Sequence, residues 1–209
     1  LICASNANNV LTDFLQTGIY DRKRDFYQTI SPSMDILISS NLERLLYHLT
    51  ENAGQVDAWM NELAERGMYD ASSLLSALKE NFWAAFADDT ATEAEIRTVH
   101  ERTQYTLDTH TAVAYRAAEA YRSETGDERP MIVLSTASPY KFGASVLHAL
   151  GEDTDGPDEF ALMERLHALS GMDIPARLAA LRTMPVLHNG ACERGRMRAA
   201  VMDFAREFS

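Results

Sequence analysis

The sequence predicts an α/β fold that is rich in helices, with part of a mostly parallel sheet and a helical subdomain. Three short apolar runs predict strands, at residues 1–4, 131–134 and 184–188. Between them, apolar residues recur at helical spacing along most of the chain. Three strands are too few for a complete sheet, so we expect the missing strands to come from sequence upstream of Leu1.

The N-terminal part begins with the first strand and an Asn-rich turn at 6–9. Residues 10–17 then predict a short helix, which Gly18 ends. After a charged loop at 21–25, the apolar periodicity of residues 36–49 predicts a helix with one buried face.

Further helices are predicted where a capping residue precedes an apolar-periodic stretch and a glycine or a turn follows it. They cover residues 55–66, about 70–86, 92–102, 108–123, 139–150, 160–169, 175–182 and 196–208. From this order we expect three regions. Residues 1–30 form a strand and helix of a large domain, 31–106 a helical subdomain or insertion, and 107–209 the rest of the large α/β domain with the C-terminal helices.

Composition limits the partners of the protein. The 209 residues carry a formal net charge of −12, which argues against binding to nucleic acid or to an anionic membrane, because both need clustered Lys and Arg. The sequence contains neither a signal peptide nor an apolar run of transmembrane length. Cys3 and Cys192 lack neighbours at metal-ligand spacing, so we expect reduced thiols in a cytosolic protein and no metal site. Because the chain opens inside an apolar run without Met, we expect an excised fragment.

The stretch 134–142, with the sequence LSTASPYKF, is the best candidate for a ligand site. Ser138 and Pro139 suit the start of a helix, so Ser135 and Thr136 stand between a strand and a helix. Open α/β sheets bind ligands at the carboxyl ends of their strands. The two hydroxyls therefore either meet a small molecule or cap free backbone groups at this turn.

Lys141 is the only one of three lysines near this candidate site; Lys23 lies in a charge run and Lys79 on the polar face of a helix. It is either a solvated surface lysine or, if the chain alone formed a Schiff base, the residue to test. An activated lysine needs a desolvated pocket or a cationic neighbour, and the sequence shows neither.

Asp108 and His110 open the helix at 108–123. Asp108 either caps this helix, with His110 in a polar corner, or the pair acts as a metal site or as an Asp-oriented base. Residues two apart on a helix do not face each other, which weakens the second interpretation. A hydrolase triad with Ser135 is disfavoured, because the sequence has no Gly-x-Ser-x-Gly elbow.

Four segments together resemble threonine synthases of the bacterial and fungal type: residues 2–12, 31–44, 108–114 and 134–142. The second, SPSMDILISSNLER, is long and close to diagnostic. These enzymes depend on pyridoxal phosphate (PLP) and have the tryptophan synthase β-like fold (fold type II). The resemblance covers the whole chain, more loosely after Gly151, but only the C-terminal part of the enzyme.

The resemblance implies a lyase of threonine biosynthesis in the cytoplasm that converts O-phospho-L-homoserine and water to L-threonine and phosphate. It also implies that the Schiff-base lysine and the phosphate-binding loop lie upstream, so the fragment alone is expected to be inactive. The enzyme is expected to be a monomer or a dimer. The alternative is a binding or interaction module that keeps the fold without the chemistry.

Residue by residue, the resemblance places the Thr136 hydroxyl at the pyridine nitrogen of PLP, with Ser135 as a weaker cofactor contact. Asp108 and His110 lie near the site, and Lys141 is a neighbour that is not the catalytic lysine. The family has His-Pro-Ala-Lys-Phe where this chain has Ser138-Pro-Tyr-Lys-Phe, so a histidine is replaced and Tyr140 is gained.

Overall fold

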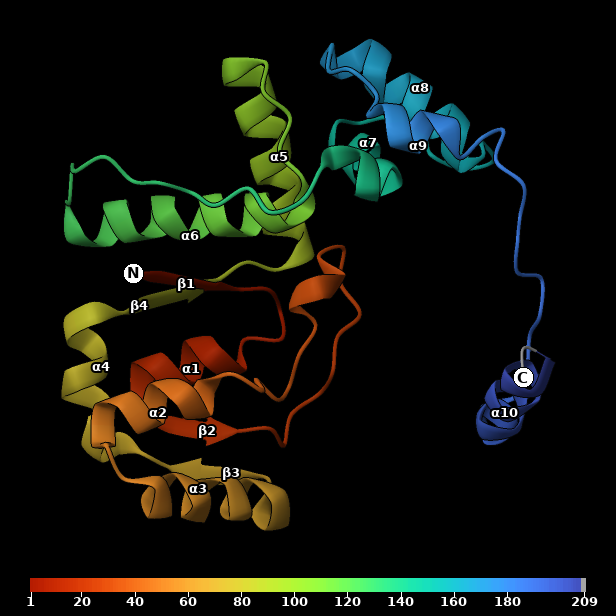
Figure 1. The fold of residues 1–209 in the computed structure, drawn as a ribbon. Coiled ribbons are helices and arrows are strands. Elements are labelled where there is room, and N and C mark those ends of the chain that lie inside the picture. The colour runs from red at the N-terminus through yellow and green to blue at the C-terminus, as the bar shows by residue number, and fades with distance from the viewer. Residues whose placement is uncertain (208–209) are drawn as a thin grey trace. The chain divides into compact units, whose positions relative to one another are not determined.

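The computed structural model describes residues 1–207, which fall into two compact units, one of Leu1–Ile174 and one that begins at Pro175. Helices dominate both units, and the first also holds two small sheets (Figure 1). This confirms the expected helix-rich α/β class. The region boundaries at residues 30 and 106 stay predictions.

The first half of unit one runs β1 (Ile2–Ser5), α1 (Val10–Thr17), β2 (Ile19–Asp21), η1 (Pro32–Met34), α2 (Leu42–Thr50), α3 (Ala53–Arg66) and β3 (Met68–Asp70). It continues with η2 (Ser72–Leu74), α4 (Leu75–Asn81), β4 (Trp83–Phe86), α5 (Asp89–Thr103), α6 (Thr109–Thr125), η3 (Pro139–Phe142), α7 (Gly143–Ala149) and α8 (Glu159–Ser170). The second unit holds α9 (Ala176–Ala180), η4 (Arg194–Arg196) and α10 (Met197–Glu207). The helix predicted at 196–208 matches η4 and α10, and its last residue, Phe208, lies outside the described residues.

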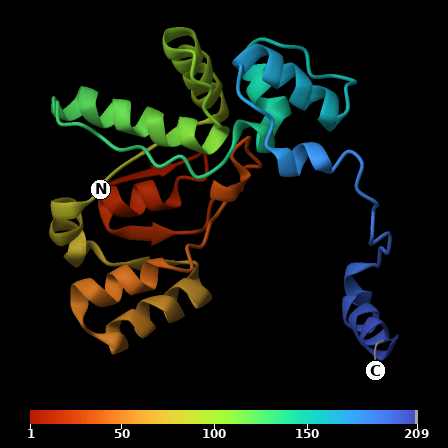
Figure 2. The same ribbon diagram turned by 45° about the horizontal axis from the view of Figure 1, so that its top comes forward.

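The sheet that matters for the site pairs β1 with β4 in parallel, with Ile2 opposite Trp83 and Ser5 opposite Phe86. Helices α6 and α1 cover its two faces (Figures 1 and 2). The second sheet pairs β2 with β3 in antiparallel fashion. The expected parallel pairing is therefore present, together with one antiparallel pair of strands that are distant in the sequence.

The main core lies around stacked aromatic rings beneath β1 and β4. The rings of Tyr20 and Tyr69 stack at 5.3 Å with an interplanar angle of 6°, and Trp59 stacks on Tyr69 at 6.0 Å. Phe14 on α1 is fully buried and tilts against both tyrosines. Burial of these large side chains fixes α1, α3 and the β2–β3 sheet to one another.

Gly18 makes the turn from α1 into β2. Its φ of +79° lies in the left-handed region that favours glycine. A Cβ here would lie 2.5 Å from Ser72 Cα, so the backbone of the neighbouring segment passes directly over the turn.

The strand predicted at 131–134 is not formed, and neither is the one at 184–188, because both segments are extended without ladder partners in the described chain. An apolar β-branched run becomes a strand only when another strand supplies its hydrogen bonds. Conversely, residues 83–86 were expected to end a helix but form β4, because β1 is available to pair with them.

The helix predicted at 36–49 starts only at Leu42. Asp35 accepts the backbone N–H of Thr29 and the side-chain amide of Asn6, so its neighbourhood is held in a loop rather than in a helix. Most other predicted helices are confirmed within a few residues at their ends. Across residues 1–207, no helix is both long and apolar enough to cross a membrane.

Candidate functional site

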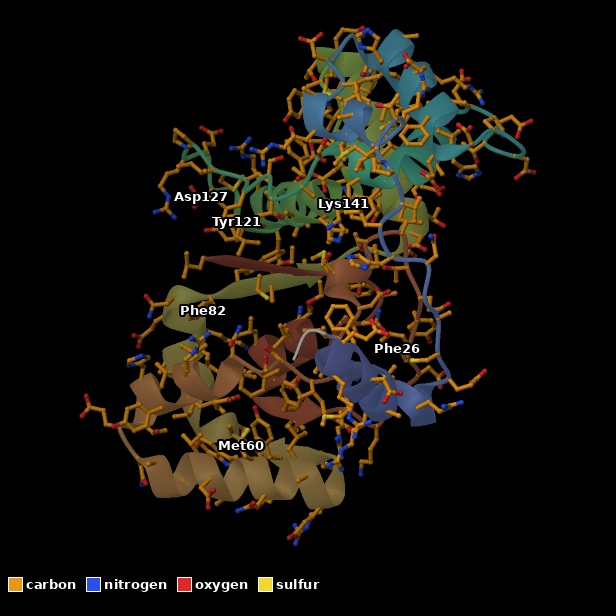
Figure 3. The ribbon with its side chains drawn as sticks, turned by 45° about the vertical axis from the view of Figure 1, so that its right-hand side comes forward. Phe26, Met60, Phe82, Tyr121, Asp127 and Lys141 are labelled. Atoms are coloured by element: carbon orange, nitrogen blue, oxygen red, sulfur yellow. The ribbon has the colours of Figure 1, made fainter. Side chains whose placement is uncertain are left out.

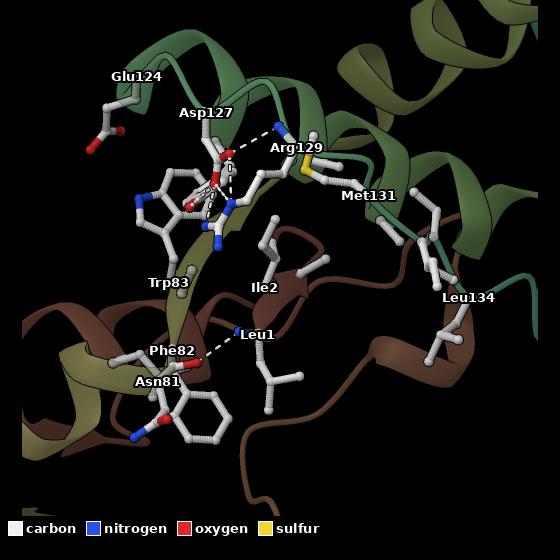
Figure 4. A pocket seen from close by; sticks show the side chains of 18 of the residues that line it. Leu1, Ile2, Asn81, Phe82, Trp83, Glu124, Asp127, Arg129, Met131 and Leu134 are labelled. Atoms are coloured by element: carbon white, nitrogen blue, oxygen red, sulfur yellow. Dashed lines mark hydrogen bonds and ion pairs between the residues drawn. The ribbon is translucent and has the colours of Figure 1, made fainter.

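A cavity of about 1350 Å³ in the first unit lies between β1, α6 and the extended segment 129–136. Figure 4 shows Leu1 and Ile2 on one wall and Met131 and Leu134 on another. The predicted site residues His110 and Thr136 both line it, at the end where the 129–136 segment runs toward η3. Two of the predicted site residues therefore lie at one cavity, and their roles there stay predictions.

Asp108 caps α6, as the first of its two interpretations held. Its carboxylate is buried and accepts the backbone N–H of His110 at 2.9 Å and of Thr111 at 3.1 Å. The Thr111 hydroxyl also donates to it. The carboxylate accepts three hydrogen bonds from the first residues of α6, so its role is to stabilise the N-terminus of that helix.

Thr111 links that anchor to the candidate ligand site. Its Oγ1 lies 3.2 Å from Ser135 Oγ, which joins the start of α6 to the end of the 129–136 segment. Ser135 and Thr136 are themselves exposed. Ser135 is thus held in place from below while its neighbour Thr136 faces the cavity.

His110 is buried, and its hydrogen bonds define its tautomer. The backbone N–H of Ser33 donates to Nε2 at 3.1 Å, so Nε2 is the unprotonated nitrogen and the proton sits on Nδ1. Nδ1 faces Thr109 Oγ1 at 3.3 Å and Asp108 Oδ1 at 3.6 Å.

Burial lowers the pKa of His110, the nearby Lys141 lowers it further, and Asp108 opposes both. The ring is therefore neutral near pH 7, and its Nε2 lone pair is occupied by Ser33. A general base needs a free lone pair, so His110 in this arrangement positions neighbours rather than accepting a substrate proton. No hydrogen bond joins it to Ser135 in the described residues, which leaves the hydrolase triad without support.

Lys141 is exposed, with its Nζ 5.2 Å from the centroid of the Phe142 ring. The Phe142 ring in turn lies 4.7 Å from that of His110. Figure 3 shows Lys141 near one end of α6 and Tyr121 with Asp127 near the other. Its ammonium lies at the exposed surface of the described chain, and its role as a neighbour of the site stays a prediction.

Tyr140, which replaces a small residue of the family pattern, is buried and donates its hydroxyl to Met172 O at 2.5 Å. Ser138 caps the same turn by accepting the Tyr140 N–H at 3.3 Å. The departure from the family pattern thus ties η3 to the segment that follows α8. These two hydrogen bonds hold η3, the turn that carries Lys141.

The analysis of the sequence did not identify the contact between the 31–35 loop and His110. Asn6, directly after β1, donates its amide to Asp35 at 2.7 Å and to Ser31 Oγ at 3.1 Å. These bonds hold the 31–35 loop so that Ser33 meets His110. The available signal was the position of Asn6 at the carboxyl end of the first strand, where ligand sites gather.

A metal centre has little basis here. Within residues 1–207, no group of three or more His, Cys, Asp or Glu side chains is arranged to hold a metal ion. Asp108 and His110, the pair considered for this role, direct their polar atoms at backbone groups of η1 and α6.

The chain is similar in sequence to known threonine synthases. Residues 111–185 match the family model described as "Threonine synthase, C-terminal". The threonine synthase of Eremothecium gossypii is 35% identical over 189 residues, a match that covers 83% of this chain and 37% of that protein. The human protein named threonine synthase-like 1 is 40% identical over 152 residues, covering 71% of this chain and 20% of that protein.

Solved structures give the same result. The crystal structure of threonine synthase from yeast superimposes with a TM-score of 0.75 at 31% identity, covering 88% of this chain and 37% of that one. The PLP-bound threonine synthase from Brucella melitensis superimposes with a TM-score of 0.68 at 35% identity, covering 83% and 36%. The chain spans little more than a third of the length of the threonine synthases it matches. In sequence and in fold, it corresponds to the C-terminal part of threonine synthases.

Proposed function

We propose that this chain is the C-terminal part of a threonine synthase that converts O-phospho-L-homoserine and water to L-threonine and phosphate with PLP. The observation that carries the proposal is the position of Thr136, exposed at the mouth of the 1350 Å³ cavity in a chain 35% identical to a threonine synthase. Cavities of roughly 300–1,000 Å³ hold cofactors and small ligands, so there is room for PLP beside other parts of the enzyme.

The residues at this mouth fit a cofactor ring. Thr136 and Ser135 present neutral hydroxyls, and Asp108, the nearest buried carboxylate of α6, is not among the residues that line the cavity. When bound, PLP supplies an electron sink for elimination and replacement. A hydroxyl at its ring nitrogen holds that nitrogen without a full proton transfer, which moderates the sink; we assign this role to Thr136.

The other residues of the site hold the segments around Thr136 in place. Ser135 is held by Thr111, and His110 keeps the 31–35 loop against α6. Lys141 lies beside Phe142 and takes no covalent part. We place the enzyme in the cytoplasm, as a monomer or a dimer.

Substitutions of Thr136 in the intact protein, with the sequence upstream of Leu1 included, test the proposal. Thr136→Val is expected to lower kcat by about tenfold or more and to shift the absorbance of bound PLP, while Thr136→Ser keeps most of both. Thr98→Val, on the exposed face of α5, is the matched control and should change neither. Absence of threonine formation by the unsubstituted intact protein would refute the proposal.

The isolated chain is expected to form no threonine. After incubation with PLP and reduction with borohydride, mass spectrometry should find no stoichiometric label on Lys141. Stoichiometric labelling of Lys141 would contradict its assignment as a neighbour of the site.

The alternative is a binding module that keeps the fold without the chemistry, which the net charge of −12 and the lack of a Schiff-base lysine motif in this chain allow. An intact protein that binds PLP or O-phospho-L-homoserine in calorimetry, yet releases neither threonine nor phosphate, would establish this alternative.

A further inference from the structure

One carboxylate, that of Asp35, joins the end of β1 to the segment before η1. Its Oδ1 accepts the side-chain amides of Asn6 at 2.7 Å and of Asn8 at 3.0 Å, both of which follow β1 directly. The same oxygen accepts the Thr29 hydroxyl at 2.7 Å, and Oδ2 accepts the Thr29 N–H at 3.1 Å. Hydrogen bonds to a charged group are stronger than those between neutral groups, so these four bonds fix residues 29–35 on the end of β1.

The segment that this carboxylate fixes also contacts the starts of two helices. The backbone N–H of Ile30 donates to Asp89 Oδ1 at the start of α5 at 3.3 Å. The backbone N–H of Ser33 donates to His110 Nε2 near the start of α6 at 3.1 Å. Both donors belong to the main chain, so both bonds depend on the conformation of the segment rather than on a side-chain rotamer.

The contact with His110 carries this effect toward the candidate cofactor contact. The His110 ring accepts the Ser33 N–H, and its centroid lies 4.7 Å from that of the Phe142 ring. Phe142 ends η3, the turn that follows Thr136 along the chain. A His110 ring that turned after loss of the Ser33 bond would change its contact with Phe142, and with it the placement of η3.

The segment and the candidate cofactor contact meet at one cavity. Ser33 and Met34 line it together with His110 and Thr136. Asp35 is half-buried and is not among the lining residues. Its carboxylate therefore acts on a ligand in this cavity only through the residues that it holds in place.

We infer that Asp35 is a positioning residue of the candidate cofactor site: by fixing residues 29–35 on the end of β1, it orients His110 and thereby holds the turn that follows Thr136. The part of this inference that concerns Thr136 and PLP rests on the proposed function. The link from Asp35 to His110 is independent of it, because every bond in that link lies within the described chain.

The first experiment measures the orientation of His110 without any activity. In the intact protein with isotope-labelled histidine, nuclear magnetic resonance should find Nδ1 of His110 protonated and Nε2 unprotonated, and the spectrum of His110→Gln assigns the signals. Asp35→Ala removes the acceptor of all four bonds, so the Ser33 bond should be lost and the His110 signals should become those of two exchanging tautomers. An unchanged His110 tautomer in Asp35→Ala would overturn the inference.

The second experiment asks whether Asp35 acts through Thr136. In the intact protein, Asp35→Ala is expected to lower kcat about tenfold, because a small misplacement of a contacting group costs rate although the group is present. In combination with Thr136→Val it should cost about twofold or less, since the contact that it positions is already gone. Fully multiplicative effects of the two substitutions would overturn the inference.

The control for this cycle is Asp13→Asn, which removes the ion pair between Asp13 and Arg24 at 2.7 Å. Asp13 lies on α1 and does not line the cavity. Its substitution should change kcat by about twofold or less, both alone and beside Thr136→Val.

A milder variant keeps the inference testable if Asp35→Ala fails to fold. Asp35→Asn keeps the oxygen that accepts the Asn6 and Asn8 amides and loses only the acceptor of the Thr29 N–H. Its His110 signals and its kcat should therefore lie between those of the unsubstituted protein and full loss of the effect. A lowered melting temperature with the unsubstituted His110 tautomer would show a purely structural carboxylate and overturn the inference.

The outcomes separate this inference from the proposed function. A changed His110 tautomer in an intact protein whose unsubstituted form makes no threonine supports the link from Asp35 to His110 and refutes the function. Threonine formation together with an unchanged tautomer in Asp35→Ala refutes the positioning role alone.

Discussion

The backbone N–H of Ser33 donates to Nε2 of His110 over 3.1 Å, which joins two segments 77 residues apart in the sequence. This single bond sets the tautomer of a buried imidazole and holds the 31–35 loop against the start of α6. It places a residue of the longest family-like segment beside the candidate cofactor wall.

Replacing His110 by Ala should destabilise the first unit by about 1–3 kcal/mol, because it removes a buried ring and with it the acceptor of the part-buried Ser33 N–H bond. Urea unfolding measures the change. His188→Ala, at an exposed position, is the control and should stay within about 0.5 kcal/mol. Equal effects of the two substitutions would show that the bond is not made.

The same residue predicts a pH dependence of stability. Because burial lowers the pKa of His110 in the folded protein, the unfolded chain binds its proton first as the pH falls. The contribution of His110 is fully present above about pH 6.5 and is lost as the pH falls from there through its lowered folded pKa. The difference in unfolding free energy between the unsubstituted chain and His110→Gln should shrink between pH 7 and pH 5; a constant difference would contradict the shift.

Asp108 should contribute more to stability than an ordinary helix cap, because it also accepts the Thr111 hydroxyl. Asp108→Ala removes the acceptor for two backbone N–H groups and for the Thr111 hydroxyl, so a loss of about 2 kcal/mol is expected in chemical unfolding. Asp108→Asn keeps one acceptor oxygen and should lose less. Asp158→Ala, at the exposed cap of α8 with a single 2.8 Å bond, serves for comparison and should cost about 1 kcal/mol.

Two stacked tyrosines should respond oppositely to loss of their hydroxyls. The buried Tyr69 Oη has no hydrogen-bond partner in residues 1–207, so Tyr69→Phe should be neutral or stabilise the protein by up to about 1 kcal/mol. The Tyr20 hydroxyl donates to Leu37 O at 3.1 Å and accepts the Ser39 N–H at 2.8 Å, so Tyr20→Phe should cost about 1–2 kcal/mol. Thermal unfolding of both variants checks the sign, and destabilisation by Tyr69→Phe would reveal an internal partner.

Gly18 and Gly126 separate backbone strain from steric overlap. Both have positive φ, +79° and +68°, but only at Gly18 would a Cβ meet another backbone, at 2.5 Å. Gly126→Ala should therefore cost about 1 kcal/mol, and Gly18→Ala at least about 2 kcal/mol more, since Ser72 must move. Comparable melting temperatures for the two variants would contradict the close approach.

The candidate site was partly readable from residue types and order. Asp108 and Ser138 were placed as caps by their position before apolar-periodic stretches, and both cap in the structure. Thr136 was singled out because hydroxyls follow an apolar run, and it lines the cavity. Ser33 and Asn6 were not found, since their roles depend on hydrogen bonds across 77 and up to 29 residues that no local pattern encodes.

What the sequence determined by itself is most of the helices, because helical hydrogen bonds and caps lie within a few residues of each other. What only the tertiary structure decided is which apolar runs become strands. Residues 83–86 form β4 because β1 lies beside them, whereas residues 131–134, which have the better strand pattern, stay unpaired across the cavity. A strand takes its hydrogen bonds from a distant segment, so its existence depends on whether that segment is present.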